Sequence, residues 1–208
     1  MSQRGTQETF TQIVCWRPRV IGASFFIFKP MIKHPWHEAP IGQQPPQRVN
    51  GIIEISIGMR AKYEVDKDTG LLKLDRVLYS SVYYPANYGF IPQTLGDDLD
   101  PLDIMILSLV PIQPLTLVPA RVIGVMHMID QGLADEKIIA VAENDASVAH
   151  LEDVTTMPEH FTRELREFFE SYKKLENKVV EVPEFQGRAV AFREIEKAIH
   201  YYREKFPK

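Results

Sequence analysis

The sequence predicts an α+β fold that is mainly β, in which a small closed barrel is followed by helices at the carboxyl end. Short strand-like runs separated by turns fill the chain from Gly51 to about Ala142, a spacing typical of small barrels. After that point, apolar residues recur at helical spacing instead. With 208 residues, of which 45% are hydrophobic and 25% charged, the chain is long enough for one domain with a core.

The expected strands are short apolar or alternating runs bounded by turn residues. Lys62–Asp66 alternates with period two, and the turn Lys67–Gly70 returns the chain along Leu71–Asp75. Gly70 supplies the positive φ that such a turn needs. The other expected strands are Ile52–Ile55, Ile104–Val110, Ala120–Met128 and Lys137–Ala142.

Two helices are expected near the end of the chain. Thr156 and Glu159 have the spacing of a capping box, and Pro158 suits the first helical turn. The buried stripe of the first helix is predicted to be Phe161, Leu165, Phe168, Tyr172 and Leu175, and that of the second Phe192, Ile195, Ile199, Tyr202 and Phe206.

The amino-terminal region divides into a basic leader and a proline-rich arm. Residues 1–33 carry five basic residues against one acid, Glu8, which is typical either of a targeting leader or of a disordered extension before a start at Met31. We favour the extension. Residues 34–50 contain four prolines and predict an extended arm on the surface. Residues 34–208 are expected to form a single domain.

Charge and cysteine content exclude several classes of protein. A formal net charge of −4 argues against nucleic acid as a partner. No run approaches the roughly 20 apolar residues that a membrane span requires. Cys15 is the only cysteine, so an intramolecular disulfide is impossible and a reducing compartment is indicated. We therefore expect a soluble cytoplasmic protein that binds neither nucleic acid nor membrane.

The strongest chemical signal is the acidic segment Gly96–Asp103. Four carboxylates within seven residues repel one another unless positive charge lies among them. Asp98, Asp100 and Asp103 precede the expected apolar strand Ile104–Val110, and at such a junction they offer the oxygen ligands that a hard cation needs. Taken alone, this segment fits a solvated acidic loop equally well. An EF-hand is excluded because the loop lacks the required glycine.

Further polar groups lie within the expected strands or in the turns between them. A second acidic segment, Asp130–Lys137, occupies the turn between two apolar strands, and Glu54 interrupts another apolar strand. Lys62 and Glu64 share one face of their strand. Tyrosines, which can donate hydrogen bonds to phosphate, are dense between residues 79 and 88. Each group has a plainer explanation as solvent-facing or packing, but together they indicate a polar mouth on one face of the barrel.

These motifs resemble those of the family I soluble inorganic pyrophosphatases. Asp98–Asp103 is similar to the aspartate signature of that family, and the similarity continues through Lys62–Glu64, Asp75–Arg76, Tyr84–Gly89, Asp130–Lys137 and Phe168–Lys173, over about residues 34–206. His34–His37 and Met128–Gly132 resemble the plant-type branch, which also has bacterial members. The resemblance implies an OB-like, five-stranded barrel and the hydrolysis of inorganic pyrophosphate to two phosphates.

The resemblance also implies a role for each matching residue. Several Mg²⁺ ions would be held by Asp98, Asp103, Asp130 and Asp135, while Asp100 would deprotonate the attacking water. The pyrophosphate substrate would be bound by Lys62, Arg76, Tyr88, Tyr172, Lys173 and Lys137. Glu54, Glu64 and Tyr84 would support these groups. A homo-oligomer is the assembly that the resemblance implies.

The main departure from the family pattern is Leu99, which stands where Gly, Ser, Asn or Asp is usual. Leu99 either points away from the metals or crowds them, and Leu133 is a lesser departure in the second acidic segment. Two alternatives to an active pyrophosphatase are an inactive relative kept for assembly and a non-catalytic barrel that binds anions. His34 and His37 are expected to pack rather than to bind metal. His127 is expected to be a hydrogen-bonded core residue.

Overall fold

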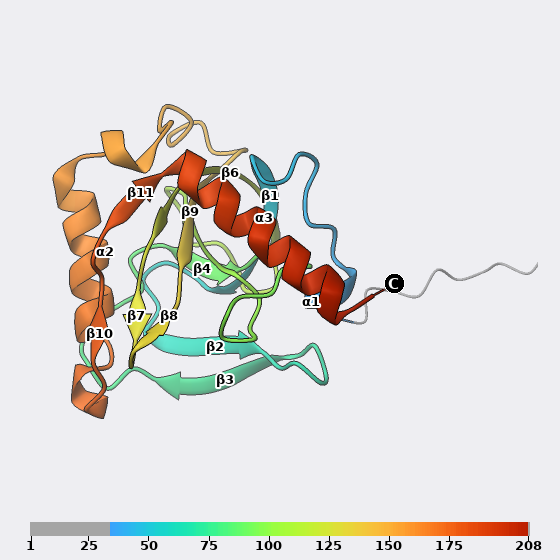
Figure 1. The fold of residues 1–208 in the computed structure, drawn as a ribbon. Coiled ribbons are helices and arrows are strands. Elements are labelled where there is room, and N and C mark those ends of the chain that lie inside the picture. Colours follow the sequence, from blue (N-terminus) through green and yellow to red (C-terminus); the bar gives the residue numbers. More distant parts are fainter. Residues whose placement is uncertain (1–33, 208) are drawn as a thin grey trace, which may run out of the picture. The chain divides into compact units, whose positions relative to one another are not determined.

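A closed five-stranded β-barrel forms the centre of residues 34–207, the part of the chain that this computed structural model describes. The strands are hydrogen-bonded in the order β1, β4, β5, β9 and β6, and β6 pairs back onto β1 (Figure 1). Their bounds are β1 Arg48–Ile55, β4 Asn87–Phe90, β5 Asp103–Leu107, β6 Leu117–Met126 and β9 Lys137–Ala142. β5 and β9 are parallel, and the other pairs are antiparallel. The predicted barrel with helices at the carboxyl end is confirmed.

Helices and additional short strands surround the barrel. They are α1 Pro35–Glu38, β2 Ala61–Val65, β3 Leu72–Val77, β7 Ile129–Asp130, β8 Leu133–Ala134, η1 Val154–Thr156, α2 Glu159–Ser171, η2 Lys174–Glu176, β10 Val180–Glu181, β11 Phe185–Gly187 and α3 Arg188–Lys205. β2 and β3 form a separate hairpin, and β10, β7 and β8 form a small sheet. Both lie toward the same end of the barrel (Figure 1). Within residues 34–207, the helices are too short or too polar to cross a membrane.

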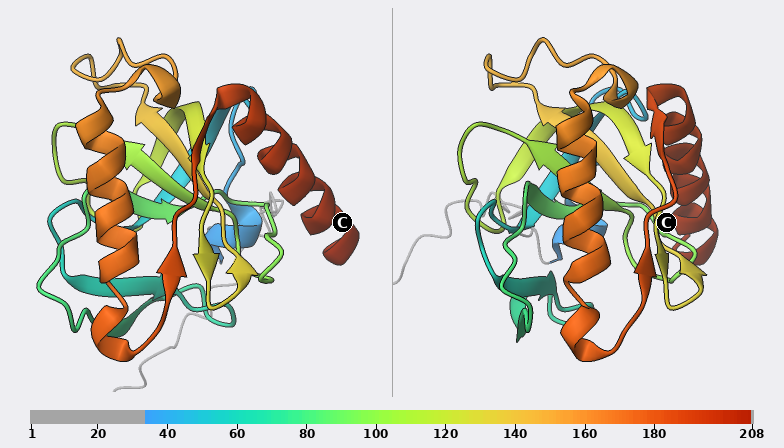
Figure 2. Two further views of the ribbon diagram at one scale, coloured as in Figure 1. Left: turned by 60° about the vertical axis from the view of Figure 1, so that its left-hand side comes forward. Right: turned by 90° about the vertical axis from the view of Figure 1, so that its left-hand side faces the viewer.

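Alternating side chains of the barrel strands pack into two separate hydrophobic clusters. In β5, Ile104 and Ile106 belong to one cluster and Met105 to the other, as expected when successive side chains point to opposite faces. The cluster of Ile104 includes Ile195 of α3, whereas the cluster of Met105 includes Phe168 of α2. The two helices therefore cover different sides of the barrel, as Figure 2 shows. Because both faces of the strands are covered, their sequences are almost continuously apolar.

Strand β4 was not predicted, because its sequence mixes polar, aromatic and glycine residues. The glycine in this strand, Gly89, has a steric reason. A Cβ atom at this position would lie 1.8 Å from the carbonyl oxygen of Ile52 on β1, so no larger residue fits between the two strands without moving the backbone. The packing of β4 against its neighbours, rather than any local preference, makes this segment a strand.

The predicted capping box of the first helix is wrong. α2 begins at Glu159, with Pro158 as its N-cap residue and no side-chain cap. Thr156 instead ends the short helix η1, whose first turn is capped by Asp153. The buried stripe of α2 is also shorter than predicted, because Leu175 lies in η2 and is 64% exposed.

The predicted surface arm is also wrong, because part of it packs into the core. Trp36 in α1 is only 4% exposed, and its Nε1 donates a hydrogen bond to the Thr94 carbonyl at 2.8 Å. His37 stacks on Trp36 and lies 2.7 Å from the hydroxyl oxygen of Tyr202 in α3, so the prediction that it packs is confirmed. The predicted leader, residues 1–33, lies outside the described residues.

Candidate active site

A polar cleft of about 490 Å³ opens where the β2–β3 hairpin, the loop before β5 and the β7–β8 turn meet. Most of the predicted site residues line it, although they come from distant parts of the chain. The predicted residues in the wall are Glu54, Lys62, Glu64, Tyr88, Asp98, Asp100, Asp103, Asp130, Asp135, Lys137, Tyr172 and Lys173. Arg76 and Tyr84 are the predicted residues that do not line this cleft.

The barrel topology brings the two acidic segments together. Asp103 begins β5, and Lys137 begins β9 directly beside it, because these two strands are parallel and neighbouring. The loop before β5 and the β7–β8 turn before β9 therefore reach the same end of the barrel. The first loop is a tight turn in which the Asp100 amide donates to Asp98 Oδ1 at 3.0 Å and Gly96 donates to the Asp100 carbonyl at 2.7 Å.

Lysine side chains lie between the carboxylates of the cleft. Lys137 is almost completely buried and forms ion pairs with both Asp103 and Asp135. Lys173 pairs with Asp130 in the same way. Burial alone would lower the pKa of Lys137, but the two carboxylates outweigh this effect and raise it. Lys137 therefore stays charged.

Burial and neighbouring negative charge also shift the pKa values of two acids in the cleft. Burial raises the pKa of Asp98, and the nearby carboxylates of Asp103 and Asp135 add to the effect. The pKa of Asp135 is raised by burial in the same way, although Lys137 opposes the shift. Both burial and neighbouring carboxylates disfavour the ionised form of these acids, and positive charge bound among them would act in the opposite direction.

The structure does not contain a preformed metal cage. Among residues 34–207, no three His, Cys, Asp or Glu side chains converge closely enough to hold an ion. The carboxylates still fit Mg²⁺ chemically, since all the donors are hard oxygens. Asp130 Oδ1 is buried without a hydrogen-bond partner among the described residues, so one acceptor already lacks a counterpart. Asp103, Asp130 and Asp135 each pair with a lysine through one carboxylate oxygen, which leaves the second oxygen available to a cation.

Two buried tyrosines supply uncharged donors. Tyr88 lies on β4 and Tyr172 directly follows α2, and both side chains are buried. Burial raises the pKa of each phenol, so both keep their protons at neutral pH. Tyr84 lies behind Tyr88, with their ring centroids 5.4 Å apart, and packs on Phe168 of α2. It therefore supports the wall without forming part of it.

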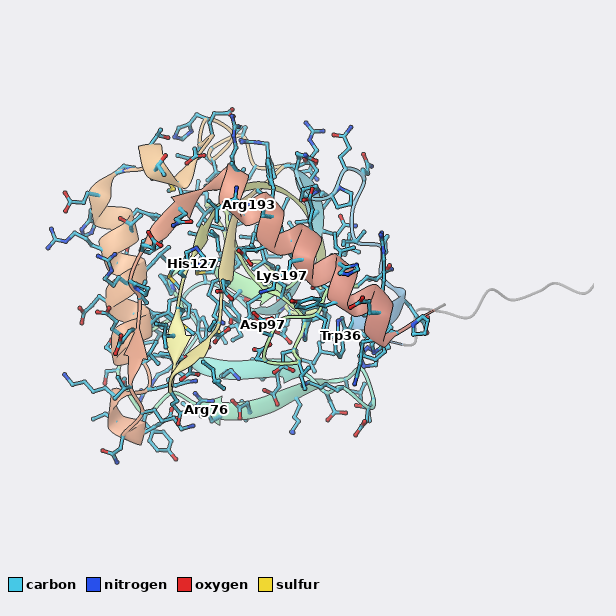
Figure 3. The ribbon with its side chains drawn as sticks, viewed as in Figure 1. Trp36, Arg76, Asp97, His127, Arg193 and Lys197 are labelled. Atoms are coloured by element: carbon cyan, nitrogen blue, oxygen red, sulfur yellow. The ribbon has the colours of Figure 1, made fainter. Side chains whose placement is uncertain are left out.

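Arg76 lies beside the cleft on β3, where Figure 3 labels it. Its Nε donates to Glu176 at 2.9 Å and its Nη1 to Asp75 at 2.5 Å. Asp75 also accepts a hydrogen bond from Lys62 Nζ at 3.0 Å, which joins Arg76 to the cleft wall. Arg76 Nη2 is buried and has no partner within the described part of the chain, so one donor remains for an anion.

The supporting acids differ in charge. Glu64 pairs with Lys62 at 3.3 Å. Glu54 is buried and accepts the Val65 amide at 2.6 Å. Burial raises the pKa of Glu54 to about 8, although the bond from Val65 opposes the shift. Glu54 is therefore largely protonated at neutral pH.

The prediction that His127 is a hydrogen-bonded core residue is wrong, because its side chain is only partly buried, with 22% exposed. Its Nδ1 lies 3.6 Å from Glu136, but its Nε2 is buried without a hydrogen-bond partner in the described structure. Sequence reasoning also missed Lys67 and Lys73, which line the cleft from the β2–β3 hairpin. The sequence did contain a clue to these two lysines. Lys62 and Glu64 had already indicated a polar face on this hairpin, and Lys67 and Lys73 belong to the same hairpin.

Comparison with known proteins identifies the family. The family model described as inorganic pyrophosphatase matches residues 51–203. Soluble inorganic pyrophosphatases of Solanum tuberosum and Arabidopsis thaliana are 50% and 48% identical over 171 residues, which cover 82% of this chain and 81% of each relative. The crystal structure of inorganic pyrophosphatase from Thermus thermophilus matches with a TM-score of 0.78 and 39% identity, covering 81% of this chain and 98% of that chain. The chain with this cleft therefore belongs to the inorganic pyrophosphatase family and is an inorganic diphosphatase.

Proposed function

We propose that this enzyme hydrolyses pyrophosphate with several Mg²⁺ ions held by Asp98, Asp103, Asp130 and Asp135. The observation that supports this proposal is that acids from two distant segments line one cleft together with lysines and tyrosines. When bound, Mg²⁺ would offset the charge of the substrate and make a water easier to deprotonate. Cations bound to Asp103, Asp130 and Asp135 would compete with Lys137 and Lys173 for these carboxylates and so make the two lysines available to phosphate.

Asp100 is the proposed general base. It lines the same cleft as Asp98 and Asp103, so it would lie near a water held by those carboxylates. It would accept the proton of that water as the oxygen attacks one phosphorus and the bond from that phosphorus to the bridging oxygen breaks, so that the second phosphate leaves. In the absence of substrate, Lys67 forms an ion pair with Asp100.

The substrate phosphates are proposed to be bound by two kinds of donor. The charged donors are Lys62, Arg76, Lys137 and Lys173, and the neutral donors are Tyr88 and Tyr172. Arg76 suits a two-oxygen contact because its guanidinium is planar. Glu64 orients Lys62, Glu54 holds the hairpin through the Val65 amide, and Tyr84 packs behind Tyr88.

The remaining assignments concern the setting of the enzyme. We propose that residues 34–208 form one catalytic domain, that the protein is cytoplasmic and that it forms a homo-oligomer. A reducing compartment is supported by the single Cys15. Nucleic acid is not a proposed partner, because the net charge is −4.

Phosphate release from pyrophosphate, with and without Mg²⁺, tests the proposal. Turnover should require the metal and stop in excess chelator. Asp100→Asn should keep the thermal stability of the native enzyme but lower kcat by at least about 100-fold, the usual scale for losing a positioned base. Undiminished hydrolysis in chelator would exclude the metal mechanism. Near-normal kcat for the variant would remove Asp100 from its role.

A further inference from the structure

The turn of the β2–β3 hairpin lies at the rim of the cleft and contributes a lysine to it. Asp66, Lys67 and Asp68 all line the cleft. Lys67 Nζ forms an ion pair with the carboxylate of Asp100, which comes from the loop before β5. The hairpin turn and the loop that carries the proposed base are therefore joined through this one side chain.

The turn that carries Lys67 is held in one conformation by its own hydrogen bonds. Asp66 Oδ1 accepts from the amide of Thr69 at 2.9 Å and from its hydroxyl at 2.7 Å. The Gly70 amide donates to the Asp66 carbonyl at 2.8 Å, and Gly70 has a φ of +70°. Such a turn presents the lysine from a fixed backbone position.

The proline-rich arm holds the same turn from outside. The carbonyl oxygen of Lys67 accepts a hydrogen bond of 2.9 Å from Nε2 of His34. His34 directly precedes α1, which Trp36 anchors in the core through its contacts with Thr94 and Phe206. The hairpin turn is thus connected to a rigid part of the fold at the residue that carries the lysine.

Lys67 differs from the buried lysines in how easily it can change partner. Its side chain is 54% exposed and that of Asp100 is 49% exposed, and an ion pair of this kind contributes little to stability. Lys137, by contrast, is only 3% exposed and lies between two carboxylates. A phosphate bound beside Asp100 carries more negative charge than one carboxylate, so it would attract the flexible ammonium group of Lys67.

We propose that Lys67 is a further substrate-binding residue, which moves from Asp100 to the phosphate that lies beside it, and that His34 is its positioning residue. This inference rests on the proposed function, because it requires the phosphate to bind next to Asp100. The non-hydrolysable analogue methylene diphosphonate provides a readout of binding that does not depend on turnover.

The first test removes the positive charge of Lys67. Lys67→Met should raise both KM for magnesium pyrophosphate and Kd for methylene diphosphonate, measured by calorimetry, by about tenfold, as expected when one charged hydrogen bond to phosphate is lost. Lys67→Arg should recover most of the affinity. The matched comparison is Lys73→Met on β3, which also lines the cleft but has only a 3.9 Å pair with Glu64 and should change Kd much less. Equal effects of the two methionine variants, or an unchanged Kd in Lys67→Met, would overturn the proposal.

The second test examines His34. His34→Ala should raise Kd for the analogue about twofold to threefold, a fraction of the effect of losing the charge itself. In the Lys67→Met background, the same change should have no further effect, since the residue that it positions has been removed. An additive effect in the double variant would show that His34 acts elsewhere. Failure of the wild-type enzyme to require Mg²⁺ would count against the proposed function alone, because the analogue titrations would still decide the role of Lys67.

Discussion

Replacing Lys137 with methionine should strongly destabilise the metal-free enzyme. The ammonium group is the shared partner of Asp103 and Asp135, and only 3% of the lysine side chain is exposed. Methionine has a similar length and would fill the space, so the loss would come from charge rather than from a cavity. Breaking a buried ion pair by removing one partner costs about 3–5 kcal/mol.

The two carboxylates decide where in this range the loss should fall. Their side chains retain 23% and 19% exposure, so water can partly replace the lysine and the lower end, about 3 kcal/mol, is expected. That loss is a large fraction of the 5–15 kcal/mol that typically stabilises a domain. Added Mg²⁺ should reduce the difference in unfolding free energy between wild type and Lys137→Met, because bound cations would restore the missing positive charge.

Urea unfolding in chelator, followed by tryptophan fluorescence, measures this loss of stability. The control is Lys197→Met, which removes a lysine paired with Asp97 at 2.7 Å, where both side chains are more than 40% exposed (42% and 43%). Figure 3 labels this pair. An exposed pair should contribute only about 0.2–1 kcal/mol. If Lys137→Met lost no more stability than Lys197→Met, the argument from burial would be refuted.

Two further predictions concern Glu54 and Leu99. Because burial raises the pKa of Glu54 from 4.5 to about 8, the folded chain retains between these values a proton that the unfolded chain releases, so this group's contribution to stability falls as pH rises through that window. In Glu54→Gln the glutamine cannot ionise but can still accept the hydrogen bond from the Val65 amide. The stability of this variant in chelator should therefore depend less on pH between 4.5 and 8 than that of the wild type. Leu99 has a φ of +67° and is mostly exposed, so Leu99→Asn should stabilise the enzyme by about 1 kcal/mol in the same urea assay.

Each of these predictions has a distinct contrary result. Parallel stability curves for wild type and Glu54→Gln across this pH range would show that Glu54 does not hold its proton in the folded state. A loss of stability in Leu99→Asn would show that the leucine side chain makes contacts that outweigh its backbone strain. The matched control for the latter is Leu133→Asn, since Leu133 is also exposed but is not among the residues with positive φ.

Several elements could be predicted from sequence because their signals are local. The β2–β3 hairpin follows from two-residue alternation and from Gly70, and α3 follows from apolar residues at helical spacing that include Ile195 and Tyr202. Strand β4 could not be predicted, since Gly89 is required only by its approach to β1. The burial of Trp36 was equally inaccessible, because its partners Thr94 and Phe206 lie far along the chain.

For the site, the sequence by itself determined the chemical groups: two acidic segments, the lysines near them and the tyrosines that follow the hairpin. Only the tertiary structure decided which charge faces which. Lys137 lies between Asp103 and Asp135 because β5 and β9 are parallel neighbours, and Lys67 meets Asp100 because the hairpin turn reaches the loop before β5. Ionic forces act between groups that are close in space, and distance in the folded chain cannot be read from spacing along the sequence.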